Sequence, residues 1–182
     1  MVIVKKEAPG TSQQALQRFT QRARKAAGLR GKVNVVLTSS REVRALNRRF
    51  RGQDKPTDVL SFSPAPLLGG ADEFGAGHWP LATGQFSGEI VISSDIAARN
   101  ARLYQHAPSQ EVKILILHGM LHLAGYDHQS DRGQMARREE RLRHDLGLTD
   151  GLIRRAERVA QVPSRVRVGA RSPSSAVRRR TR

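Results

Sequence analysis

The chain has 182 residues, of which 38% are hydrophobic, so it can build one globular domain with appendages. It has no cysteine, which excludes disulfides and thiolate metal sites, and no apolar run of the ~20 residues that a membrane span needs. A net charge of +16 favours a polyanionic partner. The short apolar stretch at the N-terminus precedes its charges, the reverse of a secretory signal, so we expect a cytoplasmic protein whose polyanion is nucleic acid.

The pattern of the first third of the chain predicts strands that alternate with helices. Apolar residues at every second position predict a half-buried strand, whereas a Ser or Thr followed three residues later by Glu or Gln predicts a helix start. The first helix should end at Gly28. Together these signals predict strands over residues 2–5, 32–38 and 59–62, and helices that begin after Thr11 and Ser39.

The elements resume after a segment rich in Gly and Pro, residues 65–87, which we expect to be a mobile surface loop. A helix/strand series of this order predicts an α+β fold, with a small sheet of about four strands covered by helices. The later elements are a strand over residues 89–92, a helix from Ser94 to about Tyr104, a long apolar helix opened by Pro108, and a last helix capped by Ser130 and ended by Gly147.

Three histidines stand close together in the run HGMLHLAGYDH. Residues four apart on a helix share a face, so His118 and His122 can converge on one metal ion. Gly125 offers the left-handed conformation that ends a helix, which lets the chain bring His128 back toward the pair. Three imidazoles and an open fourth position are typical of a catalytic zinc, whereas a structural zinc has four protein ligands.

The alternative is that these histidines are packed side chains with one hydrogen bond each, because a pair four residues apart also arises by chance. The third histidine and the helix-ending Gly125 favour the metal. So does the preceding segment VKILILHGML, which is apolar on nearly every side, where buried imidazoles need a partner. We therefore predict a metal-dependent hydrolase. His78, His106 and His144 lie outside any ligand spacing and are interpreted as structural or exposed.

The spacing H-x-x-x-H-x-x-G-x-x-H is that of the metzincin zinc proteases, which carry a Glu as general base directly after the first His. Here that position is Gly119, which has no side chain to accept a proton. The full run instead resembles the signature of the YbeY family, bacterial metal-dependent endoribonucleases of ribosomal RNA maturation. A second segment, RGQDKPTDVLSF over residues 51–62, is similar to that family's motif YR-x-x-D-x-PT-[DN]-VLSFP.

The resemblance covers roughly residues 30–146. Smaller similarities are the strand Gly88–Ser93 and the pair of Met135 and Glu139 in the last helix. The departures from the family pattern are Phe50 for the usual Tyr, Ser63 for the usual Pro, Glu89 for the usual Asp, and the insertion over residues 65–87.

The resemblance implies a mixed four-stranded sheet with helices around it and a zincin-like metal-binding helix. We expect a catalytic domain over residues 1–150 that binds one zinc ion through His118, His122 and His128. The resemblance also implies that Arg51 lies in the catalytic cleft, where a guanidinium would neutralise charge on the phosphate in the transition state. The alternative is that Arg51 is a surface residue paired with Asp54 or Asp58.

A zinc ion held by three imidazoles can lower the pKa of its water to about 7, so the missing Glu matters less for phosphodiester hydrolysis. The general acid is left open, because Asp127 beside the last histidine could equally orient an imidazole. The resemblance implies a single-strand endoribonuclease of late ribosome assembly that matures the 3′ end of 16S rRNA, with ribosomal RNA and the small ribosomal subunit as partners. A zinc peptidase, and an assembly factor with a structural metal, remain as alternatives.

The C-terminal residues 151–182 carry ten Arg and one Glu. Pro, Gly and Ser interrupt this segment, so we expect it to be largely disordered, with a short helix possible at its start. Its charge predicts an arm that binds RNA, although a solubilising tail is the alternative.

Overall fold

The computed structural model describes residues 1–64, 86–128 and 130–148. The predicted α+β class is confirmed, and none of the helices in these ranges combines the length and apolar character that crossing a membrane requires. The basic C-terminal segment and most of the expected loop lie outside the described residues. The elements are β1 (Val2–Val4), α1 (Gln13–Ala26), β2 (Lys32–Thr38), α2 (Ser40–Arg51), β3 (Val59–Phe62), β4 (Phe86–Ser93), α3 (Ser94–Leu103), α4 (Pro108–Leu123) and α5 (Gln134–Leu146).

The four strands form one mixed sheet in the order β1-β2-β4-β3. β1, β2 and β4 run parallel, and β3 pairs antiparallel with β4. The strand predicted over residues 89–92 is longer, because β4 begins at Phe86 and takes in the last two residues assigned to the loop. In the described ranges the sheet has four strands, as the sequence predicted.

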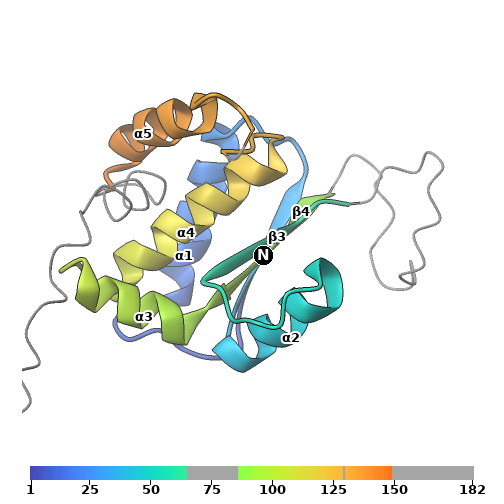
Figure 1. The fold of residues 1–182 in the computed structure, drawn as a ribbon. Helices are drawn as coiled ribbons and strands as arrows, with labels where there is room; N and C mark the ends of the chain where they lie inside the picture. The colour runs from blue at the N-terminus through green and yellow to red at the C-terminus, as the bar shows by residue number, and fades with distance from the viewer. Residues whose placement is uncertain (65–85, 129, 149–182) are drawn as a thin grey trace, which may run out of the picture.

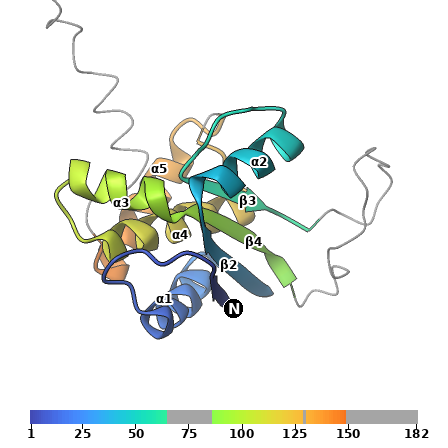
Figure 2. The same ribbon diagram turned by 90° about the horizontal axis from the view of Figure 1, so that it is seen from below.

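Helices cover the two faces of this sheet unequally (Figure 1; Figure 2). On one face α1 and α4 pack on the strands, with α3 and α5 against α4, and the larger apolar core lies between them. Among the helices of the described residues, α2 is the one that covers the other face. There the core is a small cluster of Val36, Val43, Leu60 and Val91. Alternation along each strand explains the division, because successive side chains point to opposite faces of a sheet.

Helix α4 is mostly apolar and buried along most of its length. It lies unusually close to the sheet at Gly119, where an added Cβ would stand 2.9 Å from both Ile90 Cγ2 and Ser61 Oγ. Only a residue without a side chain permits this approach. The packing therefore fixes the height of the last two turns of α4 above strands β3 and β4, and those turns carry two of the three histidines.

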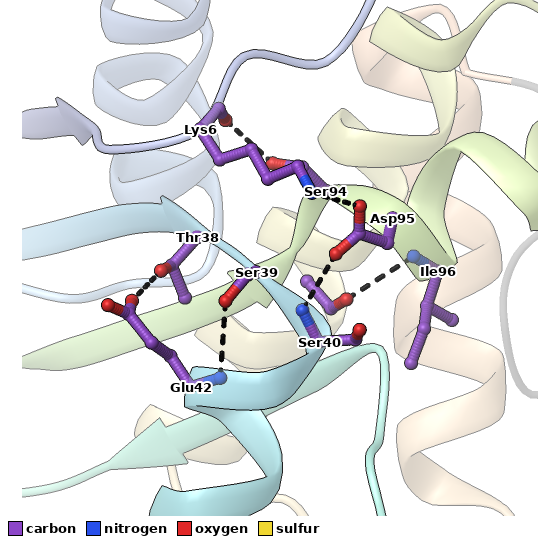
Figure 3. A network of polar contacts seen from close by, with 9 residues as sticks. Lys6, Thr38, Ser39, Ser40, Glu42, Ser94, Asp95 and Ile96 are labelled. Atoms are coloured by element: carbon purple, nitrogen blue, oxygen red, sulfur yellow. Dashed lines mark hydrogen bonds and ion pairs between the residues drawn. The ribbon is translucent and has the colours of Figure 1, made fainter.

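The carboxyl ends of the parallel strands are closed by polar contacts (Figure 3). Helices α2 and α3 begin directly after β2 and β4, and Asp95 in α3 accepts a hydrogen bond from the backbone amide of Ser40 in α2 (2.8 Å). Asp95 also pairs with Lys6, whose carbonyl accepts from the hydroxyl of Ser94 (2.8 Å). Ligands often bind at this edge of α/β sheets. Here polar groups of the chain itself form hydrogen bonds and an ion pair with one another across this edge.

Three of the observed helix starts differ from the predicted ones by one to three residues. The observed N-caps of α1, α3 and α5 are Ser12, Ser93 and Gly133, where the sequence predicted Thr11, Ser94 and Ser130. Adjacent hydroxyl residues have similar capping propensity, so the end of the preceding strand or turn decides between them. For α5 the carboxylate of Asp131 takes the capping role and accepts from the amide of Met135.

Candidate metal centre

The structure brings together the three histidines that the sequence singled out. His118 and His122 project from the last two turns of α4, and the chain then turns at Gly125, whose φ of 89° is left-handed. This turn returns His128 to the pair. The ring centroids are 4.8 Å apart for His118 and His122, and 5.4 Å apart for each of the two with His128. One nitrogen of each ring lies within 4.8 Å of the others, so the three could hold one metal ion.

Burial differs across the three rings. His118 is only 4% exposed, His122 is half-buried and His128 is exposed. The group is therefore buried on the side of His118 and accessible to solvent on the side of His128. Such an arrangement leaves room for a substrate atom or a water molecule beside three protein ligands.

Helix α5 supplies a partner for the most buried ring. The Nδ1 atom of His118 donates to the carboxylate oxygen Oε1 of Glu139 at 3.0 Å, and Glu139 is itself buried. Because a carboxylate accepts, the ring proton of His118 resides on Nδ1 and the lone pair on Nε2 points into the group. Carboxylate–histidine pairs of this kind orient metal ligands and raise their basicity.

The second ring is oriented in the same way by the backbone. His122 Nδ1 donates to the carbonyl oxygen of Tyr126 at 3.0 Å, so its lone pair is also on Nε2. The two Nε2 atoms then face each other at 3.1 Å. Two lone pairs at this distance repel unless a cation lies beside both. Two imidazoles on a tetrahedral zinc stand about 3.3 Å apart at their nitrogens, so the donor set fits such an ion.

The electrostatic surroundings keep the ring of His122 in the form that a metal needs. Burial, followed by the nearby His118 and His128, lowers the pKa of His122 from 6.5 to about 4. The carbonyl of Tyr126 acts in the opposite direction and does not offset these causes. His122 is therefore a neutral ligand at neutral pH, with no proton to displace from Nε2.

Arg51 is the exposed last residue of α2, and Gly52 follows it in the left-handed conformation. The acidic residues that the sequence offered as its surface partners have other contacts. Asp54 makes two hydrogen bonds with Arg44, at 2.8 and 2.9 Å, and Asp58 accepts from the hydroxyl of Thr57. A catalytic role of Arg51 remains a prediction.

The other histidines and Asp127 lie outside the group of three histidines or have other contacts. His106 contacts the buried carboxylate of Glu111 at 2.8 Å, and His144 is exposed, as the sequence indicated for both. His78 lies outside the described residues. Asp127 accepts a hydrogen bond from the hydroxyl of Ser130 (3.0 Å).

Sequence reasoning noted Glu139 as a family similarity but missed its contact with His118. A signal was present, because Glu139 lies on the same helical face as Met135 and Leu142, which are both buried. A carboxylate at an apolar position of an amphipathic helix needs a buried partner. The carbonyl of Tyr126 left no such signal, since every residue carries a carbonyl.

Comparisons with known proteins agree with these features. The family described as "Endoribonuclease YbeY" matches residues 2–147. A relative of that name from Koribacter versatilis is 49% identical over 161 residues, which are 88% of this chain and 95% of the relative. Another from Solibacter usitatus is 40% identical over 154 residues, 84% of this chain and 92% of the relative.

A solution structure of a protein from Thermotoga maritima is similar in fold, with a TM-score of 0.50 and 27% identity, over 92% of this chain and 100% of that one. The family match spans both motifs and every helix and strand that the structure describes. The chain therefore belongs to the YbeY family of endoribonucleases, hydrolases that act on RNA.

Proposed function

We propose that the protein is a zinc-dependent, single-strand-specific endoribonuclease that matures the 3′ end of 16S rRNA during late ribosome assembly. One zinc ion per chain is bound by His118, His122 and His128. The observation that carries the proposal is the pair of Nε2 lone pairs at 3.1 Å, each fixed by a hydrogen bond on the far side of its ring. A cytoplasmic location and the small ribosomal subunit as partner follow from this role.

Residues of the chain then have separate roles in hydrolysis. A zinc ion bound at this centre supplies Lewis-acid chemistry, which acidifies water and polarises a phosphoryl oxygen. Glu139 and the Tyr126 carbonyl hold the imidazoles in the tautomer with Nε2 free. The exposed position of His128 leaves the centre open to a phosphodiester from one side. Arg51 neutralises phosphate charge in the transition state.

A peptidase role is disfavoured by the packing of α4. Metzincin proteases need a Glu at the position of Gly119. Here the space beyond Gly119 is filled by the side chains of Ile90 and Ser61, so a side chain at this position would clash unless they moved. Phosphodiester hydrolysis, by contrast, does not require a protein base at that position.

The alternative of an assembly factor with a structural metal is disfavoured by the donor set. Structural zinc sites are closed by four protein ligands. In the described ranges, the group that could hold a metal consists of three histidines, and one of them is exposed. We propose that residues 1–150 form the catalytic domain and that residues 151–182, with ten Arg and one Glu, form an arm that holds RNA.

The proposal is tested by measuring zinc content and cleavage of a 16S rRNA precursor for wild type and His118→Ala. We expect about one zinc per wild-type chain, a trimmed 3′ end, and loss of both in the variant. His144→Ala is the matched control, because His144 is exposed and outside the group. Precursor cleavage by metal-free His118→Ala at the wild-type rate would overturn the proposal, and so would a zinc-loaded wild type that leaves the precursor intact.

Arg51→Ala tests the second site residue. It should retain zinc and slow cleavage at saturating RNA by roughly 10- to 1,000-fold, as expected for a lost charge partner of the transition state. Arg51→Lys should recover only part of the rate, since the planar guanidinium is lost. Wild-type rates in Arg51→Ala would contradict the assignment.

A further inference from the structure

Helix α2 presents an arginine-rich surface outside the metal centre. It carries five arginines, all exposed, and one glutamate. The glutamate, Glu42, accepts from the hydroxyl of Thr38, and Arg44 pairs with Asp54. No ion pair within the described ranges involves the other four arginines of the helix, which are Arg41, Arg48, Arg49 and Arg51.

An aromatic ring lies at the edge of this surface. Phe50 is 42% exposed, although most large apolar side chains of the described residues are buried. Its ring meets Phe62 of strand β3 edge-to-face, with centroids 5.3 Å apart and an interplanar angle of 67°. The guanidinium of Arg49 lies 5.2 Å from the centre of the Phe50 ring. Phe62 thus supports an exposed ring that already has a cation beside it.

A single exposed Phe needs no functional explanation. The combination here is more specific, because proteins that bind single-stranded nucleic acid place aromatic rings and arginine planes beside one another. Unpaired bases stack on the rings, and phosphates contact the arginines. A duplex would offer phosphates alone, since its bases are already stacked on each other.

We propose that Phe50 and Arg49 form a stacking platform for an unpaired base of the RNA substrate, with Arg48 contacting a neighbouring phosphate. The inference rests on the proposed endoribonuclease function for the identity of the partner. Arg51 follows Phe50 directly, so a strand held at this platform lies next to the residue assigned to the transition state. Phe50 is a positioning residue, distinct from the metal ligands and from Arg51.

The test is the binding of a fluorescently labelled single-stranded RNA, followed by anisotropy, with gel analysis to show that the RNA stays intact. Loss of one base stack should weaken binding roughly 5- to 100-fold in Phe50→Ala. Phe50→Leu should be almost as weak, although it keeps an apolar side chain against Phe62. Phe50→Trp should bind as tightly as wild type, because it keeps an aromatic face.

Leu103→Ala is the matched control, since Leu103 is also a large exposed apolar residue, at 69%, and lies on α3. Its RNA affinity should equal that of wild type. Arg48→Ala should reduce the slope of log affinity against log salt by about 0.7, the value for one phosphate contact on a single strand, whereas Phe50→Ala should leave the slope unchanged.

Wild-type RNA affinity in Phe50→Leu and Phe50→Ala would overturn the platform. So would a loss that appears equally with duplex RNA, or one that appears with anionic lipid vesicles and not with RNA. Precursor cleavage is measured separately. A wild-type protein that needs Phe50 to bind RNA but cleaves no precursor would refute the proposed function and leave the platform standing.

Discussion

Two regions of the molecule gather polar side chains, and they differ in whether those groups are satisfied. Around Asp95, each donor faces an acceptor: the amide of Ser40 and the ammonium of Lys6 both meet its carboxylate. At the end of α4, His118 and His122 turn two acceptor nitrogens toward each other at 3.1 Å. A dense polar cluster is therefore no evidence of a site by itself. The evidence for a site lies in groups that the protein orients but for which it supplies no hydrogen-bond donor.

The two regions also lie toward opposite ends of strand β4. The Asp95 contacts follow its last residue, Ser93. The histidine end of α4 lies over its beginning, where Leu123 would touch a Cβ placed on Gly88. The edge at which α/β sheets often bind ligands is thus used for structure, and the three histidines lie toward the opposite end of the sheet.

Loss of a ligand should break the metal centre most completely. His122→Ala removes one of the two facing nitrogens, so we expect a purified protein with almost no zinc, where wild type holds about one per chain. Elemental analysis measures this. An unchanged zinc content in His122→Ala would show that the three histidines are packed side chains after all.

Loss of an orienting contact should weaken the centre without removing a ligand. Glu139→Gln keeps the size of the side chain but replaces a buried carboxylate that accepts from His118. We expect zinc affinity to fall about 10- to 100-fold, as for other outer-shell partners of metal-bound histidines. Competition with a chelator measures it, with Glu140→Gln on the same helix as the control. Equal affinity in the two variants would mean that Glu139 serves stability alone.

Gly119→Ala tests the close packing that positions the histidines. The added Cβ would stand 2.9 Å from Ile90 and from Ser61, so we expect a loss of about 1–3 kcal/mol in the free energy of unfolding. Alanine has the higher helix propensity, by about 1 kcal/mol, so loose packing would give stabilisation instead. Denaturant unfolding decides the sign. The double variant with Ser61→Gly should recover part of the loss.

The smallest effect is expected in the satisfied network. Asp95→Asn weakens the contacts with Ser40 and Lys6 and should cost about 1 kcal/mol of unfolding free energy, with zinc content unchanged. The contact with Lys6, followed by that with Ser40, lowers the pKa of Asp95. Its contribution should therefore be present above pH ~4 and disappear as the pH falls further.

The control for this variant is Asp54→Asn, which breaks a surface pair with Arg44 in which both side chains are about half exposed. It should change the free energy of unfolding less than Asp95→Asn does, because solvent screens an exposed pair. A larger effect there than at Asp95 would contradict the distinction drawn between the two carboxylates.

Local patterns predicted most of the helices and strands and the histidine group, because helical spacing and a helix-ending glycine act within a few residues. His118, His122 and Gly125 are of this kind. The contact between His118 and Glu139 spans 21 residues of sequence, and neither residue specifies the other. The sequence shows that Gly119 stands where metzincin proteases have a catalytic Glu. It does not show that α4 packs closely on β3 and β4 at this residue, because that contact depends on the tertiary fold.

The unequal covering of the sheet has a consequence for motion. Among the residues that the structure describes, 22 buried apolar residues form one cluster on the α1 and α4 side, whereas the cluster on the α2 side has four. Segments with few buried contacts open first in native proteins, so backbone amides of α2 should exchange with deuterium well before those of α4. The histidines would then stay in place while the arginine-bearing helix detaches and docks again. A rigid metal centre would thus be paired with a surface that can adapt to strands of different shape.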